Sequence, residues 1–360
     1  MSNILSKSPY IVEVSATGLT GGKVEIFLWK EGSTISALPQ YTLSKLSPAS
    51  NVTKVYFDVA PYVNEYISTK FYNPNSEASY MALPIENYCN VTIKEYKIVG
   101  GVTTYLSSET KYGFKGFLFQ KDSINGSYLN ALLDQKTYYY HYDSSKTYSN
   151  YPAGDITYLS RYYPLFPQFV TLTYTNLVTN VQVIKTEAVN GWVKMPRVLP
   201  ANWAVGNKLE ISYTNDPNPE IEPQVYYFKP MEECKYSPII LDFVNKYGAW
   251  QREFLFKNST ESISMENQTY KNYRTNPIAF NSQESLSTTF NTNATESIKT
   301  NTGWVDESYK DTITQLLLSD NILLNNRPAT ITTKQIDLQK NINNKLINYS
   351  LDFQFSNSVI

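Results

Sequence analysis

Two runs of alternating side chains, at residues 239–244 and 250–256, stand out in the hydrophobic pattern of the chain. A period of two is typical of β-strands, because successive side chains point to opposite faces of a sheet. The residues between the runs, Asn245 to Gly248, favour a turn, and Gly248 stands where positive φ is common before a return strand. The pattern predicts a β-hairpin. Its large aromatic residues are expected to form the nucleus of a local core: Phe243, Trp250 and Phe254.

Residues 8–120 consist of short apolar runs separated by turn residues, which is the pattern of an all-β domain. We expect about seven strands, at residues 10–14, 23–30, 39–44, 53–59, 90–99, 102–107 and 113–119. This number in about 110 residues is typical of an immunoglobulin-like or fibronectin-type β-sandwich. A short helix, started by Pro61, is expected at residues 61–67.

From residue 121 to 167 the periodicity is poor and tyrosines accumulate, so we expect a long irregular segment. Strands are expected after it, at residues 169–174, 181–185 and 224–228. The dipeptide Asn190-Gly191 is a strong signal for a hairpin turn, because both residues adopt positive φ easily.

The C-terminal third begins with the predicted hairpin and then becomes polar from residue 257 to about 301. A long helix is expected near residues 305–319, with Asp306 as its cap. One apolar face at helical spacing supports it: Val305, Tyr309, Ile313, Leu316 and Leu317. Asn325 and Asn326 predict a hairpin loop between two short apolar runs, and residues 347–356 alternate strictly, as in an amphipathic strand.

These patterns together predict a mainly β protein with immunoglobulin- or fibronectin-like sandwich domains and a C-terminal α+β portion that carries one long helix. The expected domains are an N-terminal β-sandwich at residues 1–120, a tyrosine-rich β and loop domain at 121–231, and the α+β domain at 232–360. The composition agrees, because 31 Tyr, 16 Phe and 5 Trp favour pleated surfaces and the many Asn and Ser favour turns.

The net charge, the length of the apolar runs and the first residues of the chain argue against several classes of protein. With 31 Lys and Arg against 32 Asp and Glu, the net charge is -1 and there is no concentrated basic patch for nucleic acid. No apolar run approaches the length of a membrane span, and the first residues lack the features of a secretory signal. Cys89 and Cys234 are far apart without a partner motif, so we interpret them as buried thiols, with a disulfide as the alternative.

Catalytic and metal-binding motifs are not found in the sequence. One histidine, His141, excludes a multi-histidine metal site and a histidine triad, and we interpret it as a loop or interface residue. Asp216, Asn218 and Glu220 alternate like calcium ligands, but the intervening prolines favour a solvated turn. We therefore expect no catalytic residue, no metal and no cofactor, and the protein is not expected to be an enzyme.

The tyrosine cluster is the one candidate interaction site. Its members are Tyr138, Tyr139, Tyr140, Tyr142, Tyr148 and Tyr151. Aromatic side chains are enriched at protein interfaces, so packing between subunits is the preferred interpretation, and stacking on a sugar is the alternative.

A four-residue sequence, Thr-Glu-Ser-Ile, occurs at residues 260–263 and again at 295–298. In a chain so rich in Ser and Thr, we interpret this repeat as a coincidence.

Several stretches carry a resemblance to a known group of proteins. They are Ser8-Pro9-Tyr10 with the strand Lys23–Trp29, residues 57–63, the F-V-N-K-Y-G-A-W-Q core of residues 240–251, residues 257–262, and residues 302–305 leading to 315–319. Together they resemble structural proteins of tailed phages that infect Bacteroidota, including crAss-like and flavobacterial phages. The resemblance transfers no site residues, and residues 121–230 contribute almost nothing to it.

The resemblance implies a non-enzymatic virion protein of the tail or neck, such as a tail-tip or baseplate component, made in the host cytoplasm. Its partners would be other virion structural proteins. A glycan-binding adhesin that recognises a host surface glycan through its tyrosines is the alternative. From the residues themselves we expect a homo-oligomer, most simply a ring, with interfaces built from residues 138–163, 257–301 and the C-terminal strand.

Overall fold

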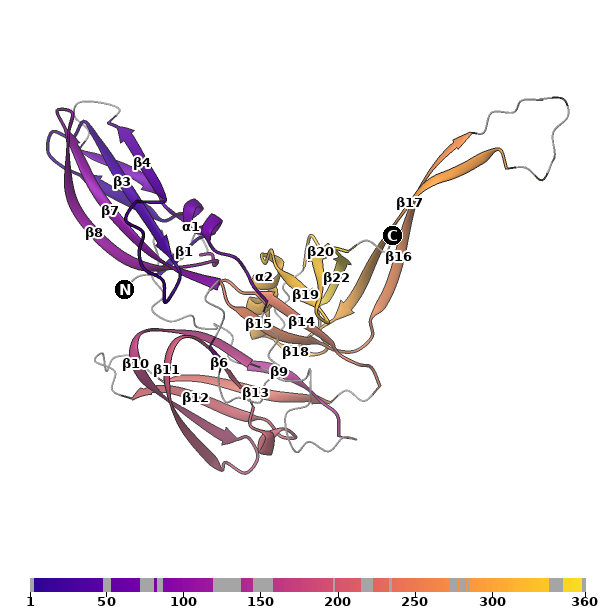
Figure 1. The fold of residues 1–360 in the computed structure, drawn as a ribbon. Helices are drawn as coiled ribbons and strands as arrows, with labels where there is room; N and C mark the ends of the chain where they lie inside the picture. Colours follow the sequence, from indigo (N-terminus) through magenta and orange to yellow (C-terminus); the bar gives the residue numbers. More distant parts are fainter. Residues whose placement is uncertain are drawn as a thin grey trace.

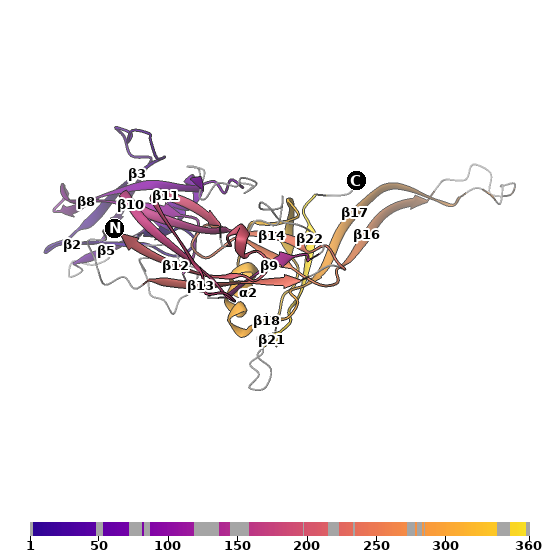
Figure 2. The same ribbon diagram turned by 90° about the horizontal axis from the view of Figure 1, so that it is seen from below.

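A computed structural model describes residues 3–47, 53–71, 81–82, 87–118, 137–144, 158–196, 198–214, 223–232, 235–271, 278, 283, 285–336 and 346–357. Within these residues the protein is mainly β, with several sheets and two short α-helices. The strands form three groups, and a long two-stranded hairpin projects from the third group (Figure 1, Figure 2).

The first group contains a five-stranded sheet with the order β1-β8-β7-β3-β4 and a two-stranded sheet, β2-β5. The pair β1 and β8 is parallel, and the other pairs are antiparallel. Its elements are β1 (Asn3–Leu5), β2 (Ile11–Ser15), β3 (Gly21–Trp29), β4 (Tyr41–Leu46), β5 (Lys54–Asp58), α1 (Ala60–Tyr66), β7 (Tyr88–Val99) and β8 (Val102–Phe114). The expected short helix is confirmed as α1, and the strand expected at 102–107 is one part of the longer β8.

One core lies between these two sheets. Val14 and Phe57 from the small sheet and Val24 and Ile93 from the large sheet are buried in the same hydrophobic cluster. Alternating side chains on β2, β3 and β5 supply this cluster, because every second residue of a strand faces the same side. The two sheets therefore pack face to face.

The second group is a six-stranded sheet with the order β6-β11-β10-β12-β13-β9. Its strands are β6 (Met81–Ala82), β9 (Thr137–Tyr142), β10 (Tyr158–Asn176), β11 (Gln182–Pro196), β12 (Asn207–Thr214) and β13 (Gln224–Glu232), and a 3-10 turn, η3 (Pro200–Asn202), precedes β12. The expected hairpin turn at Asn190-Gly191 is wrong, because both residues lie within strand β11, at a register shift where Gly191 is opposite Tyr163. The chain turns instead between β10 and β11, where Asn180 has φ 58°.

The third group is a seven-stranded sheet with the order β15-β14-β19-β20-β22-β17-β16, beside a two-stranded sheet, β18-β21. Its elements are β14 (Ile239–Val244), β15 (Trp250–Leu255), β16 (Thr260–Lys271), β17 (Ser287–Asn301), β18 (Val305–Asp306), η4 (Glu307–Tyr309), α2 (Lys310–Leu317), β19 (Ile322–Leu324), β20 (Arg327–Ile331), β21 (Leu346–Ile347) and β22 (Ser350–Phe355). The predicted hairpin is confirmed, with Val244 opposite Trp250 across β14 and β15.

The amphipathic C-terminal strand is also confirmed, as β22, but its expected role at an interface is corrected. It pairs with β20 on one side and with β17 on the other, so its backbone groups are used within the chain. Leu351 and Phe353 point into the core while Ser350 and Gln354 are exposed. A strand with neighbours on both sides has no open edge for a partner.

The long helix expected at residues 305–319 is wrong. Residues 305–306 form strand β18, residues 307–309 form the 3-10 turn η4, and only Lys310–Leu317 is α-helical. The Asp306 side chain makes no capping hydrogen bond to the turn, and its carboxylate lies 3.4 Å from Nζ of Lys229. Pairing of Val305 with Ile347 in the small sheet accounts for the shorter helix.

The cores of the second and third groups are continuous. Tyr140, Phe228 and Leu172 of the second group belong to the same buried cluster as Phe243 and Phe353 of the third. Strand β6 (Met81–Ala82) precedes residue 120 in the sequence but pairs with β11 of the second group. The second and third groups therefore have separate sheets but one hydrophobic core.

Residues 257–301, a polar stretch in which no strand was identified from the sequence, contain the long strands β16 and β17. Strand β16 pairs with β17 along its full length, and the pair extends away from the rest of the molecule (Figure 1, Figure 2). We call residues 260–271 and 287–296 the β-arm. All twelve residues of β16 are exposed.

Candidate functional site

The tyrosines proposed as an interaction site lie mostly inside the protein. Tyr138, Tyr139 and Tyr140 are on β9 and are buried in the core that the second and third groups share. A buried side chain offers no surface to another subunit or to a sugar, so these three residues are corrected to packing within the chain. Tyr142 is half-buried against the same core, and Tyr148 and Tyr151 lie outside the described residues.

Hydrogen bonds and ring contacts explain why three consecutive tyrosines can be buried. The Tyr140 hydroxyl donates to the carbonyl of Trp203 at 2.6 Å, and the Tyr139 hydroxyl accepts from the backbone N–H of Asp306 at 3.2 Å. Tyr138 stacks on Phe228 with ring centroids 5.3 Å apart. Burial raises the pKa of Tyr139 and Tyr140 well above that of an exposed phenol, so both remain neutral.

The other residues singled out by sequence are not gathered into one site. His141 is also on β9 and is buried, so it is a strand residue and not a loop residue. Asp216, Asn218, Glu220 and Cys234 lie outside the described residues. Among the residues that are described, no group of three or more His, Cys, Asp or Glu side chains could hold a metal ion.

Cys89 is a free, fully buried thiol in the core of the first group. Burial raises its pKa to about 12, which leaves only about one molecule in ten thousand as thiolate at pH 8. We predict that iodoacetamide at pH 8 leaves Cys89 unmodified in the folded protein and alkylates it in urea, as peptide mass spectrometry can measure. Equal labelling in both conditions would show that Cys89 is accessible.

The turn between β14 and β15 joins the third group to the first, and we call residues 245–250 the joint. The Asn245 side chain holds the turn from within, because its Oδ1 accepts the backbone N–H groups of Tyr247 and Ala249, each at 3.1 Å. The Lys246 carbonyl accepts the backbone N–H of Phe117 at 2.7 Å. The turn residues thus make backbone contact with the chain that follows β8.

Side chains of the joint complete a small core that the first group cannot form alone. Tyr247 and Ala249 are buried in one cluster with Leu5, Tyr88, Tyr112 and Phe114. Residues more than a hundred positions apart in the sequence therefore share this cluster. Separation of the two groups would expose it to water, which is unfavourable in proportion to the apolar area uncovered.

Gly248 is the residue of the joint that tolerates no side chain. Its φ is +83°, and a Cβ there would lie 2.8 Å from the backbone nitrogen of Lys115. We predict that Gly248→Ala destabilises the protein by about 1–3 kcal/mol more than Gly32→Ala, as urea denaturation can measure. Gly32 is a matched control, because its φ is +76° but no atom lies within 4 Å of the added Cβ. Equal losses would show that the joint is open enough to accept a methyl group.

Trp250 extends the joint to the segment that follows α1. Its ring packs edge-on against Phe71 with centroids 5.0 Å apart, and its indole N–H donates to the carbonyl of Lys70 at 3.1 Å. The sequence predicted a core position for Trp250 next to Phe243, but Phe243 points into the core of the third group and Trp250 faces the first. Trp250 is therefore a contact between groups.

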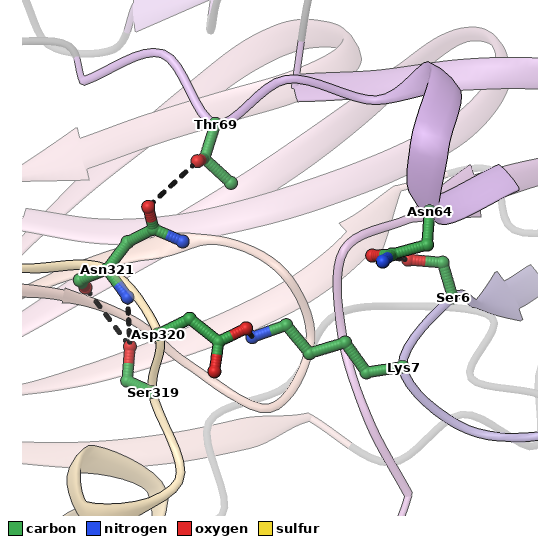
Figure 3. Close-up of polar contacts among 7 residues, drawn as sticks. All are labelled: Ser6, Lys7, Asn64, Thr69, Ser319, Asp320 and Asn321. Carbon is green, nitrogen blue, oxygen red and sulfur yellow. Dashed lines mark hydrogen bonds and ion pairs between the residues drawn. The ribbon is translucent and has the colours of Figure 1, made fainter. Parts of the chain in front are cut away.

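Polar contacts close the same boundary (Figure 3). Nζ of Lys7 lies 2.7 Å from the Asp320 carboxylate, and the Thr69 hydroxyl donates to Oδ1 of Asn321 at 3.1 Å. Asn321 is itself held by Ser319, whose hydroxyl donates to the Asn321 carbonyl at 3.1 Å. Two segments of the first group, one before β2 and one after α1, thus contact the loop that follows α2.

A buried ion pair lies directly behind the joint. The Arg252 guanidinium donates to both carboxylate oxygens of Asp242, at 2.9 and 2.7 Å, and both side chains are 1% exposed. On the other face of β15, Glu253 accepts hydrogen bonds from Gln251 at 2.8 Å and from Tyr309 at 3.5 Å. Burial of the Asp242 and Arg252 charges has a desolvation cost, which their bidentate hydrogen bonds offset.

The β-arm differs from the joint in that all of β16 and much of the distal part of β17 are exposed. Ile263, Met265 and Phe290 are more than 60% exposed. Near its base, Arg327 donates to both carboxylate oxygens of Glu296. The candidate functional site is therefore a projecting arm on a body whose parts are locked together by the joint.

Comparison with known proteins adds no assignment to this geometry. Within the residues that the structure describes, no helix is long and apolar enough to cross a membrane. No protein-family model matches the sequence, and no curated protein is significantly similar to it.

Proposed function

We propose that this chain is a non-enzymatic structural protein of a phage virion, a component of the tail tip, baseplate or neck that contacts neighbouring virion proteins. The observation that carries the proposal is the β-arm. Twelve consecutive exposed residues in a regular strand, projecting from a closed body, form a contact element and not a catalytic one.

An isolated two-stranded ribbon is at best marginally stable in water, because it has no core of its own. Four large apolar side chains of the β-arm are exposed: Ile263, Met265, Tyr270 and Phe290. Contact with a neighbouring protein would remove this apolar surface from water. The arm is thus expected to gain most of its order on assembly.

The joint supports the same proposal from the other side. A virion component has to present its contact surfaces at defined angles. The joint connects the first and third groups by a backbone hydrogen bond and a shared core, and the ion pair of Lys7 and Asp320 adds to this connection. In this proposal the two packed sheets of the first group serve as an immunoglobulin- or fibronectin-like module. The protein would be made in the host cytoplasm and then incorporated into the particle.

The glycan-binding alternative has less support. It depended on an exposed tyrosine surface, and three of its six residues, Tyr138, Tyr139 and Tyr140, are buried in the core. The hydroxyl groups of Tyr139 and Tyr140 and the ring of Tyr138 make contacts within the chain. The structural role is therefore the function that we propose.

The proposal is tested on purified phage particles and on a variant without the β-arm. In that variant residues 262–297 are replaced by Asn-Gly, which joins the strands at the pair Glu261 and Ile298. We expect peptides of the full chain in particles purified by density gradient, a cryo-EM density that fits its three groups, and loss of the shortened chain from the particles. Its melting temperature serves as the folding control. Absence of the full chain from purified particles would refute the proposal.

A further inference from the structure

The seven-stranded sheet ends in an open edge. In the described part of the chain, β16 has a neighbour on one side only, where it pairs with β17. Its twelve residues are exposed on both faces, so no other described element covers the edge. The backbone groups along such an edge are available for pairing with a strand of another chain.

The repeated sequence Thr-Glu-Ser-Ile lies at this edge, and its two copies pair with each other. Ser262 stands opposite Ser297, Glu261 opposite Ile298, and Ile263 opposite Glu296. The two serine hydroxyls are 2.9 Å apart and share a hydrogen bond. The repeat, interpreted as a coincidence from the sequence, therefore has a structural consequence. The sequence Thr-Glu-Ser-Ile pairs with a second copy of itself in antiparallel orientation.

A self-complementary strand has a defined way to meet a second copy. When two identical antiparallel strands are related by a twofold axis perpendicular to the sheet, one residue stands opposite its own copy. The register seen within the chain makes that residue the serine of the repeat, which on the open edge is Ser262. Glu261 of each copy would then face Ile263 of the other, so no two like charges stand directly opposite.

The distal part of β16 is less suited to such a contact. A twofold axis at Glu266, the middle of the strand, would place two carboxylates directly opposite each other, which is destabilising. The repeat lies near the base of the arm, where the salt bridge between Glu296 and Arg327 connects the neighbouring strand β17 to β20. Charge and support both favour the register about Ser262.

We propose that the open edge of β16 pairs antiparallel with β16 of a second copy of this chain, about a twofold axis at Ser262, with residues 260–264 of each copy in the contact. This inference rests on the proposed assembly role of the arm and names its partner. The contact is isologous, in contrast to the heterologous ring interfaces expected from the sequence. It joins the two seven-stranded sheets into one.

A charge exchange at Ser262 tests the register, because only a residue opposite its own copy responds to it. Ser262→Asp and Ser262→Lys chains are each purified, then mixed in equal amounts and analysed by native mass spectrometry. We expect each variant alone to dimerise less than the unsubstituted chain. In the mixture, we expect the ratio of mixed dimers to homodimers to rise about fivefold above its statistical value of one. Melting temperatures of both variants check that each chain is folded.

Thr269 provides the matched control on the same strand. It is exposed like Ser262, but in the proposed register the two copies of Thr269 lie roughly 45 Å apart. Mixing Thr269→Asp with Thr269→Lys chains should therefore give the statistical fraction of mixed dimers. A chain that stays monomeric at its highest soluble concentration, statistical mixing at Ser262, or an equal preference at Thr269 would each overturn the inference.

The chain with residues 262–297 replaced by Asn-Gly separates this inference from the proposed function. It should be monomeric, and dimers of undiminished affinity would place the contact elsewhere and overturn the inference. Presence of the full chain in purified particles without a charge preference at Ser262 would leave the proposed function standing. A charge preference at Ser262 in a chain that is absent from particles would support this inference and refute the proposed function.

Discussion

Trp250→Ala is expected to destabilise the protein by about 3–5 kcal/mol, because it removes a large buried aromatic side chain and leaves a cavity at the joint. Trp250 is 3% exposed, packs on Phe71 and donates a hydrogen bond to the carbonyl of Lys70. Truncation also removes one of the two side-chain hydrogen bonds to that carbonyl, which keeps the bond from Nδ2 of Asn87 at 3.0 Å. Urea denaturation followed by circular dichroism measures the loss.

A distinctive result should accompany the loss of stability. Because Trp250 connects segments 180 residues apart in sequence, its removal weakens the link between the first and third groups more than either core. We therefore expect the single unfolding transition to broaden or to separate into two. Trp304→Ala is the control, since Trp304 is 58% exposed and its replacement should cost less than about 0.5 kcal/mol. An unchanged midpoint for Trp250→Ala would mean that the joint does not hold the groups together.

Local patterns predicted those elements whose structure depends on local physics. The hairpin of β14 and β15 follows from alternation and from the need for positive φ at Gly248, which has φ +83°. The loop at Asn325 and Asn326 was predicted because asparagine tolerates this conformation, and their φ angles are 48° and 66°. In each case the turn residues and the flanking strands agree.

Strand β16 of the β-arm was missed because alternation indicates a buried face, and no residue of β16 is buried. Every residue of β16 is exposed, so its polar and apolar side chains follow no period. Strand β9 was missed for the opposite reason. Tyr138, Tyr139 and Tyr140 are buried on both faces of the strand, so the sequence does not alternate there. An unbroken run of tyrosines was therefore interpreted as an irregular segment that forms an interface.

The helix at residues 305–319 shows that a correct burial pattern can come with a wrong element. Val305, Tyr309, Ile313 and Leu316 are all buried, as the helical spacing required. Val305 is nevertheless in a strand, and Tyr309 ends a 3-10 turn. A strand, a 3-10 turn and a short helix in succession can point the same side chains inward, so spacing alone does not distinguish them.

The candidate sites were partly visible in the sequence, but their partners were not. Trp250 was recognised as a buried residue, whereas its neighbour Phe71 lies in a different group of strands. The repeat at residues 260–263 and 295–298 was recognised too, but a sequence repeat does not show whether its two copies are neighbours in the structure. Only the antiparallel register, with Ser262 opposite Ser297, turns it into a statement about complementarity.

The ion pair of Asp242 and Arg252 leads to the second large prediction. Arg252→Met is expected to cost about 3–5 kcal/mol, because it leaves the Asp242 carboxylate buried without the guanidinium that satisfies both of its oxygens. Asp242→Leu combined with Arg252→Met should recover most of this loss, since a well-packed apolar pair avoids the desolvation cost of both charges. Thermal and urea unfolding of the four chains in this double-mutant cycle give the coupling between the two side chains.

The exposed pair of Arg327 and Glu296 is the matched control for geometry, because it is also bidentate but stands in water near the base of the β-arm. Arg327→Met should change stability much less than Arg252→Met, since solvent screens the charge that remains. If Arg252→Met and Arg327→Met lower the free energy of unfolding equally, burial is not the source of the effect. If the double variant is as unstable as Arg252→Met, the pair is required for more than mutual neutralisation. In that case its fixed geometry, directly behind the turn that enters the first group, is what stabilises the joint.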